Sequence, residues 1–172
     1  MRLLVPVTCS LILLATPARA ADPTGDWRVE DGTANIRIAN CGGSLWGVVA
    51  WEKVSGGRDA QNPDPALRDR PTLGLPILLD MKQTSPQRWE GRIYNAENGK
   101  MYTGSIRPID ANTLRVEGCV LGFLCGGQDW TRVAQTAPAP QTKGVNPKVA
   151  GKAGASMIDV CSRISNLSGR PH

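Results

Sequence analysis

The chain has 172 residues, a hydrophobic fraction of 41% and a formal net charge of +5. The excess positive charge lies at the two ends, because residues 21–133 carry 13 Lys and Arg against 14 Asp and Glu. Nucleic-acid binding requires a clustered basic surface on the folded body. The near-neutral body therefore predicts no nucleic-acid partner.

Residues 1–20 have the pattern of a secretory signal peptide. Arg2 precedes an apolar run over residues 3–15, and Ala18-Arg19-Ala20 has the small-residue form of a cleavage site. The run is too short to span a bilayer, and no later segment is apolar for long enough to do so. We therefore expect a periplasmic protein whose mature chain begins near Ala21 and has no transmembrane segment.

Residues 21–134 are predicted to form one β-barrel domain, because short segments of alternating apolar and polar residues are separated by turn residues. Asp31-Gly32 and Asn98-Gly99 are typical of tight hairpins, since these residues tolerate positive φ angles. The predicted strands are residues 27–29, 34–39, 45–53, 76–82, 88–94, 101–109, 113–119 and 128–134. Strands of this number, linked mostly by hairpins, favour an all-β, eight-stranded up-and-down antiparallel barrel over a flat β-sandwich.

The two ends of this domain suggest how a barrel would close. Trp27 lies in a Gly-x-Trp opening of the first strand, and Arg132 ends a Trp-x-Arg sequence in the last strand. We expect the Arg132 guanidinium to cover an inward-facing Trp27 in a cation–π contact, with Trp130 also structural. This pairing resembles the one at the barrel base of the lipocalin or calycin superfamily.

A second resemblance covers nearly the whole domain, from Gly25 to Val133. Six sequence blocks occur in order: GDWRVEDGTANIRI, CGGSLWGVVAW, NPDPALRDRPTLG, ILLDM, RWEGRIYNAENGKMYTGSI and GCVLGFLCGGQDWTR. They resemble the secreted bacterial family called domain of unknown function 2147. The resemblance implies a calycin-like barrel in the envelope of Gram-negative bacteria, and it implies no established activity. Family members often carry a second cysteine after the CGxxL turn, where this chain has Trp46.

Four cysteines remain in the mature chain, which allows three disulfide connectivities. Cys119 and Cys125 flank a short loop, and we expect them to pair in an oxidising compartment. Cys41 lacks the neighbour that the family resemblance implies, so Cys161 is its available partner within the chain. An intermolecular disulfide or two free thiols are the alternatives.

The segment after the barrel divides into two parts. Residues 135–154 are rich in Ala, Pro, Gly and Lys and are predicted to be a flexible linker. Residues 155–172 are predicted to hold a short amphipathic helix, which begins at a capping box over residues 156–159. Because a helix of this length is marginal alone, it should pack on the barrel or a neighbouring chain. A helix that binds a partner protein is the alternative.

The sequence predicts no catalytic residue, no metal site and no cofactor. Its one histidine is His172, the last residue, so the usual general base, haem ligand and zinc ligand are missing from the body. Asp64 and Asp69 are the remaining acid–base pair. Their neighbours Arg68 and Arg70 favour an ion-paired loop over a hydrolytic site.

The irregular segment over residues 54–74 is the longest between two predicted strands. In small barrels a ligand enters at the mouth beneath such a loop. We predict that Asn62, Arg68 and Arg70 contact the ligand there, with the arginines holding an anionic head group through bidentate hydrogen bonds. The alternative is that both arginines brace the loop against nearby carboxylates.

Aromatic residues on the predicted strands raise the question of what lies inside the barrel. Trp51, Trp89 and Tyr102 are predicted to line a pocket for an apolar ligand, together with Trp46, Tyr94 and Trp130. An eight-stranded barrel can equally be filled by such side chains. The first hypothesis is therefore a protein that binds a small apolar or amphipathic molecule. The alternative is a non-enzymatic structural or interaction protein with a filled barrel and an envelope protein partner.

Overall fold

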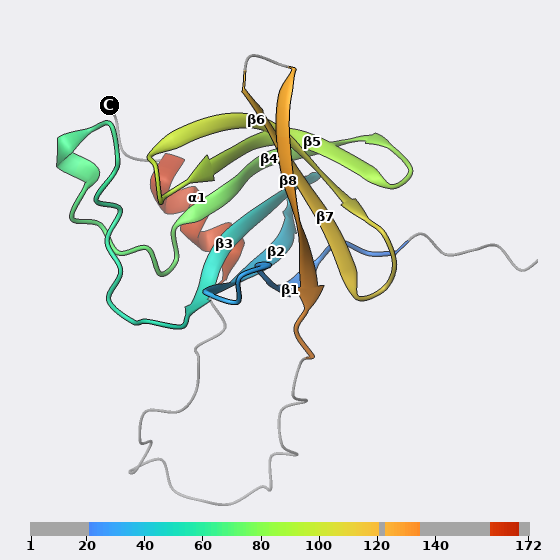
Figure 1. Ribbon diagram of the computed structural model, residues 1–172, viewed down its shortest axis with the longest axis horizontal. Coiled ribbons are helices and arrows are strands. Elements are labelled where there is room, and N and C mark those ends of the chain that lie inside the picture. Colours follow the sequence, from blue (N-terminus) through green and yellow to red (C-terminus); the bar gives the residue numbers. More distant parts are fainter. Residues whose placement is uncertain (1–20, 121–122, 135–158, 169–172) are drawn as a thin grey trace, which may run out of the picture.

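A computed structural model describes residues 21–120, 123–134 and 159–168. Its strands form a closed antiparallel barrel in which each strand pairs with the next and β8 returns to β1 (Figure 1). The strands are β1 (Gly25–Arg28), β2 (Ala34–Cys41), β3 (Ser44–Glu52), β4 (Pro76–Ser85), β5 (Arg88–Asn95), β6 (Lys100–Pro108), β7 (Thr113–Val120) and β8 (Leu124–Arg132). The predicted up-and-down barrel is confirmed, and the flat sandwich is excluded by closure.

The predicted strands differ from the observed ones mainly at the last hairpin. We predicted a final strand from residue 128, but β8 begins at Leu124 and pairs with β7 from there. Cys125 lies opposite Cys119, and Gly126 lies opposite Gly118. The two adjacent glycines of β8 indicated a turn, whereas the ladder to β7 runs through both of them. The disulfide crosses this ladder and reinforces the hairpin.

The base of the barrel is closed by Trp27 and Arg132, as predicted. The Arg132 guanidinium carbon lies 4.1 Å from the centroid of the Trp27 ring. Arg132 also donates hydrogen bonds from Nη1 to Thr24 O at 2.8 Å, and from Nε to Ala111 O at 2.6 Å. Trp27 itself is fully buried, and its indole Nε1 donates to Pro23 O at 2.8 Å. Arg132 Nη2 donates to Asp22 O at 2.5 Å, so each guanidinium nitrogen and the indole nitrogen has a protein acceptor.

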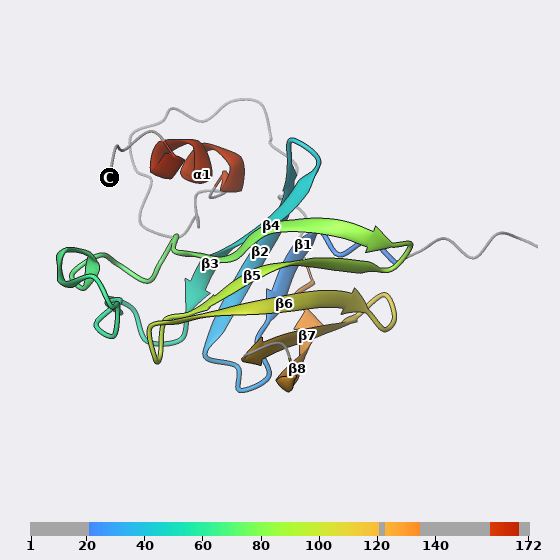
Figure 2. The ribbon, with the colours of Figure 1, turned by 90° about the horizontal axis from the view of Figure 1, so that it is seen from above.

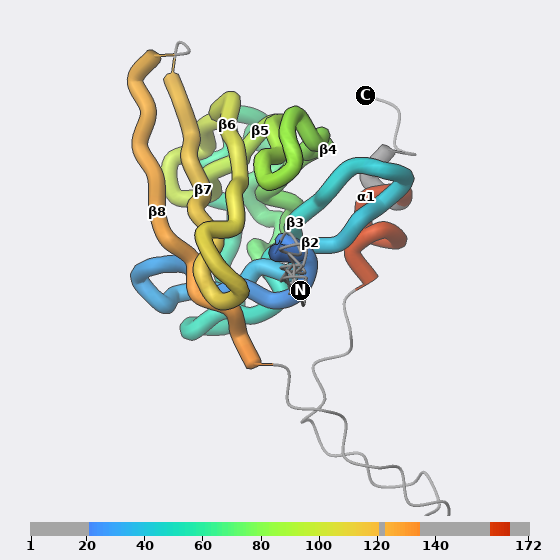
Figure 3. The backbone as a smooth tube through the Cα atoms, turned by 90° about the vertical axis from the view of Figure 1, so that its right-hand side faces the viewer, coloured from blue at the N-terminus to red at the C-terminus, as the bar shows by residue number. Residues whose placement is uncertain are grey.

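Backbone pairing contributes little to this closure. In the described part of the two strands, β1 and β8 pair at Trp27 with Arg132 and at Arg28 with Thr131. One further backbone hydrogen bond, from Val133 N to Asp26 O at 2.8 Å, follows these pairs. β1 ends at Arg28, so the rest of β8 pairs with β7 alone. The β7–β8 hairpin extends beyond the neighbouring strands in Figure 3. Side-chain contacts at the base therefore stabilise the junction of the first and last strands more than the backbone ladder does.

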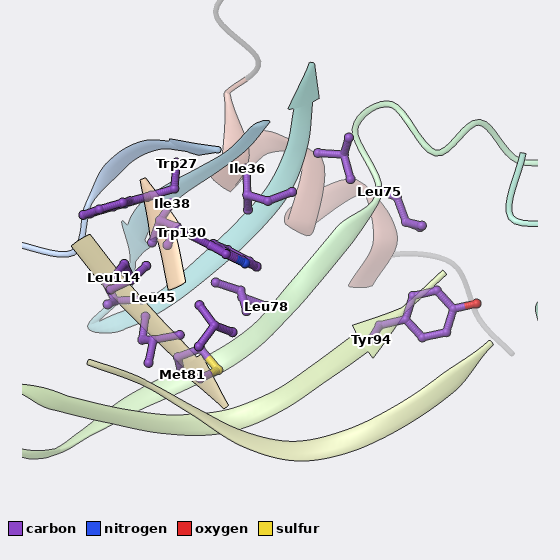
Figure 4. Close-up of a cluster of buried hydrophobic side chains, with 13 residues drawn as sticks. Trp27, Ile36, Ile38, Leu45, Leu75, Leu78, Met81, Tyr94, Leu114 and Trp130 are labelled. Atoms are coloured by element: carbon purple, nitrogen blue, oxygen red, sulfur yellow. The ribbon is translucent and has the colours of Figure 1, made fainter. Parts of the chain in front are cut away.

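Large apolar side chains fill the half of the barrel next to the base. Ile38, Leu45, Leu78, Met81 and Leu114 are each at most 3% exposed. Figure 4 shows them gathered beside Trp27 and Trp130, with Tyr94 apart from the cluster and its hydroxyl directed away from it. Close packing of this kind is the main source of stability in a single-core domain.

A helix, α1 (Val160–Ser168), lies outside the barrel wall beside β2 and β3 (Figures 2 and 3). A disulfide between Cys41 and Cys161 attaches it to the end of β2, and Val160 is buried at the contact. Of the pairings that the sequence left open, the structure therefore contains Cys41–Cys161, together with the expected Cys119–Cys125.

The start of α1 differs from the prediction. Asp159 caps the helix, because its Oδ1 accepts a hydrogen bond from the backbone N–H of Cys161 at 3.0 Å. The predicted capping residue, Ser156, lies outside the described residues. So do the signal peptide over residues 1–20 and the linker over residues 135–154, which stay predictions. Within the described ranges, no helix is both long and apolar enough to cross a bilayer.

The contact at the base generates a stability prediction. Replacing Arg132 with Met keeps an apolar stem over Trp27 but removes the charged hydrogen bonds and the cation–π contact. We expect Arg132→Met to lower the free energy of unfolding by about 2–4 kcal/mol, measured by urea denaturation with both disulfides intact. Arg107 is the matched control, since it is exposed on β6 and forms no ion pair in the described structure. Equal urea midpoints for Arg132→Met and Arg107→Met would contradict the role of Arg132 in closing the barrel.

Candidate ligand-binding cavity

The barrel contains a cavity of about 480 Å³ at the end opposite the base. Because successive strands alternate in direction, the β1–β2, β5–β6 and β7–β8 hairpins meet at this end, as does the long β3–β4 loop. The three hairpins all contribute lining residues. Its volume lies within the range of about 300–1,000 Å³ that is common for small-molecule sites.

The wall of this cavity is mainly apolar. Aliphatic side chains from six strands or their ends face it, including Val29, Ile36, Val49, Ile77, Ile93 and Val116. Three aromatic residues, Tyr94, Tyr102 and Trp130, also line it. Trp130 is 4% exposed and its Nε1 donates to Gln128 Oε1 at 3.0 Å, so its polar atom is satisfied. Such a surface favours apolar parts of a ligand.

Two glycines on the inner face of the β7–β8 hairpin leave the space open. A Cβ at Gly126 would have no heavy atom within 4 Å, and one at Gly118 would touch the Tyr102 side chain at 3.4 Å. The two residues are directly paired across the hairpin. A larger side chain at either position would therefore project into the cavity. No sequence motif pointed to these two glycines, although their alternation with Cys119 and Cys125 is a usable signal.

One wall of the cavity is held in place by a buried carboxylate. Asp59, in the β3–β4 loop, is fully buried. Its Oδ1 accepts from the Tyr94 hydroxyl at 2.6 Å, and its Oδ2 accepts from Asn62 Nδ2 at 2.7 Å and from Arg70 Nε at 2.8 Å. Arg70 also forms an ion pair with Asp59 at 2.7 Å. We call these four residues the Asp59 cluster. A buried charge is stable only when paired in this manner.

The Asp59 cluster ties the loop to the rim of the barrel. Tyr94 lies at the end of β5, so its ring faces the cavity while its hydroxyl reaches the loop. Next to it, the β5–β6 turn packs against the loop at Gly99, where a Cβ would lie 1.8 Å from Gln61 O. Gly99 also has a φ of +67°, so glycine is required there for two reasons.

The loop residues predicted to contact a ligand are instead engaged with the loop itself. Arg70 is bound to Asp59, and Arg68 Nε donates to Asn62 O at 2.8 Å. Asn62 is 5% exposed and holds Asp59 and the Tyr94 hydroxyl. Arg70 therefore braces the loop against a carboxylate, as in the alternative prediction, whereas Arg68 braces it against a backbone carbonyl. A ligand contact for these three residues stays a prediction.

The other three predicted residues lie in different places on the barrel. Tyr102 lines the cavity. Trp51 is 38% exposed near the end of β3, where the Arg28 guanidinium lies 4.9 Å from its ring centroid. Trp89 is partly buried against the core and does not contribute to the cavity lining. The structure therefore brings only Tyr102 of these six residues to the cavity.

The two loop carboxylates considered as an acid–base pair lie at the surface. Asp64 and Asp69 are exposed, and Asp64 caps a short 3-10 helix, η1 (Pro65–Leu67), by accepting from Ala66 N at 2.9 Å. Across the described residues, no three His, Cys, Asp or Glu side chains converge as a metal site would need.

A closed eight-stranded barrel with a packed base and an apolar cavity at its other end is a lipocalin-like fold. Residues 25–132 match the family described as "Uncharacterized protein conserved in bacteria (DUF2147)", and the chain belongs to that family. This confirms the resemblance that the six sequence blocks indicated.

A comparison of folds leads to the same class. The chain is similar to a solved structure described as "Protein HP1028 from the human pathogen Helicobacter pylori belongs to the lipocalin family". The TM-score is 0.62 at 18% identity, over 67% of this chain and 85% of that one. At this identity the likeness shows the fold alone. No curated protein matches the chain.

The Asp59 cluster makes a prediction about Tyr94. Burial, and next the hydrogen bond to Asp59, raise the pKa of the Tyr94 hydroxyl above its usual value near 10. The contribution of the neutral Tyr94 hydroxyl to the free energy of unfolding is therefore complete below pH 10. It is lost as the pH rises through the pKa of Tyr94 in the folded state. The chain has two tyrosines, so absorbance of tyrosinate in Tyr102→Phe reports Tyr94 alone. We expect the pH midpoint of tyrosinate formation to be higher in the folded Tyr102→Phe variant than in the same variant unfolded in urea. Equal pH midpoints in the folded and unfolded variant would contradict the burial of the Tyr94 hydroxyl against Asp59.

Proposed function

We propose that this chain is a periplasmic, non-enzymatic binding protein that holds a small apolar or amphipathic molecule inside its barrel. The observation that carries the proposal is the cavity of about 480 Å³, with its mainly apolar wall. The barrel is filled at the base and open at the other end, which is the arrangement a protein needs to hold one small ligand.

The periplasmic location rests on the predicted signal peptide and on the two disulfides. Cys41–Cys161 and Cys119–Cys125 both suit an oxidising compartment. Family membership adds no activity, since the family is described as uncharacterized. The non-enzymatic part of the proposal rests on the chemistry of the cavity, whose described lining contains no His or Cys. Of the two lining hydroxyls bound to a carboxylate, Tyr94 is bound to the buried Asp59, and Thr33 is bound to Asp31 in an exposed hairpin turn.

A second candidate, an envelope interaction protein, is supported by one observation. The tip of the β7–β8 hairpin presents Phe123 at 71% exposure and Leu124 at 61%. Exposed apolar side chains at a projecting tip are typical of contact surfaces. This candidate does not need an occupied cavity, so a binding experiment separates the two.

The test uses a fluorescent naphthylamine probe, N-phenyl-1-naphthylamine, whose emission rises in an apolar site. We expect saturable binding by the mature protein with both disulfides formed. Gly126→Leu should weaken this binding by about tenfold or more, because a Cβ at Gly126 has open space around it and the larger side chain would project into the cavity. No binding by the wild-type protein would overturn the proposed function.

The matched control is Thr131→Leu on the same strand. Thr131 is exposed on the outer face of the barrel, one residue after the inward-facing Trp130. This variant adds apolar bulk to β8 outside the cavity and should bind the probe like the wild type. Both variants should unfold within about 0.5–1 kcal/mol of the wild type, which shows that the fold is kept. Equal loss in both variants would mean that the probe binds elsewhere.

A further inference from the structure

The polar residues around the cavity are acidic or neutral. Asp31 and Glu97 supply carboxylates, and Thr33, Asn95 and Gln128 supply neutral groups. Of the described residues that line the cavity, none is Lys, Arg or His. Asp31 comes from the β1–β2 hairpin and Glu97 from the β5–β6 hairpin, so the two carboxylates belong to different parts of the rim.

The two carboxylates differ in their surroundings. Asp31 Oδ1 accepts from the backbone N–H of Thr33 at 2.9 Å and from its hydroxyl at 2.7 Å. These hydrogen bonds lower the pKa of Asp31, so it stays ionised at neutral pH. Glu97 is exposed, and in the described structure its carboxylate forms no hydrogen bond or ion pair.

The two loop arginines near this end of the barrel are bound to groups other than Asp31 and Glu97. Arg70 lies 5.7 Å from the centroid of the Tyr94 ring, but its guanidinium is bound to Asp59. Arg68 is bound to the backbone carbonyl of Asn62. Lys53 is exposed and near enough to Asp31 to favour the ionised form of that carboxyl. Lys100 is exposed as well, and it pairs with Asn95 in the hairpin that carries Glu97. Lys53 and Lys100 are therefore the nearby lysines whose charge must be tested.

We propose that the cavity prefers an amphiphile whose polar group is a cationic amine over one that carries a carboxylate or phosphate. The inference rests on the proposed function, since it describes the ligand of the same cavity. It also reverses the anionic head group expected from Arg68 and Arg70. An apolar chain would occupy the barrel, and the ammonium would remain at the rim between the Asp31 and Glu97 hairpins.

The size of the preference follows from the electrostatics of an exposed rim. Exposed pairs of opposite charge contribute little each, and like charges oppose binding by a similarly small amount. The lysines at the rim cancel part of the effect of the two carboxylates, so we expect a preference of roughly three- to tenfold for an amine over a carboxylate on the same chain. The preference should decrease as salt is added, because exposed charges are screened.

The experiment compares decylamine, decanol and decanoate as competitors of the naphthylamine probe, at pH 7.5 and low salt, below micelle formation. The three share one alkyl chain, so the head group is the variable. We expect decylamine to compete best, decanol next and decanoate least. Glu97→Gln and Asp31→Asn should each reduce the ratio of amine to carboxylate affinity, and decanol should compete equally in every variant. Lys53→Gln and Lys100→Gln should each increase that ratio.

The outcomes separate the inference from the proposed function. If neither the probe nor decanol binds, the proposed function fails. If both bind but decanoate competes as well as decylamine or better, the cavity is a binding site and the inference is wrong. The inference is also wrong if both carboxamide variants keep the full preference. Glu97→Gln is decisive where Asp31→Asn alters the β1–β2 turn, because the Glu97 carboxylate has no structural partner in the described chain.

Discussion

The stacking of Arg132 on Trp27 is the contact on which the rest of this barrel depends. The first strand has four residues, and its ladder to the last strand is two residue pairs long. A barrel with so short a seam would open unless side chains also joined its edges. Arg132 does this with one guanidinium, which covers the indole and donates to backbone carbonyls before β1 and between β6 and β7.

Closure at the base has a consequence at the other end of the barrel. With Trp27, Leu45, Met81 and Leu114 packed near the seam, the base half has no room for a ligand. Toward the opposite end, β7 and β8 place Gly118 and Gly126 on the inner face, and the wall there is open. The sequence left open whether the barrel is filled or hollow. The structure shows that it is filled in one half and hollow in the other.

Local patterns were sufficient to predict the fold. Alternation gave the strands, Asp31-Gly32 gave a hairpin, and the Trp27 and Arg132 motifs indicated which strands meet. The start of β8 was wrong because Gly126 and Gly127 are typical of turns, whereas here pairing with β7 and the Cys119–Cys125 disulfide keep them in a strand.

The site was harder to predict because it depends on contacts between residues far apart in the sequence. Arg68 and Arg70 lie in the longest loop and were expected to hold a ligand. Their actual partners are Asn62 and Asp59, and Asp59 in turn binds Tyr94 from another hairpin. No spacing rule connects Asp59 with Tyr94. Gly118 and Gly126 were missed for a related reason. Whether a glycine leaves a cavity open depends on which residues from other strands surround it.

The central claim is that the hollow half of the barrel holds a ligand. The most direct test is the native mass of the mature protein, purified gently from a Gram-negative periplasm without reductant. The account predicts the mass of the processed chain with two disulfides, plus an adduct small enough for a cavity of about 480 Å³ that organic solvent removes. A bare chain that also fails to take up the naphthylamine probe would contradict it.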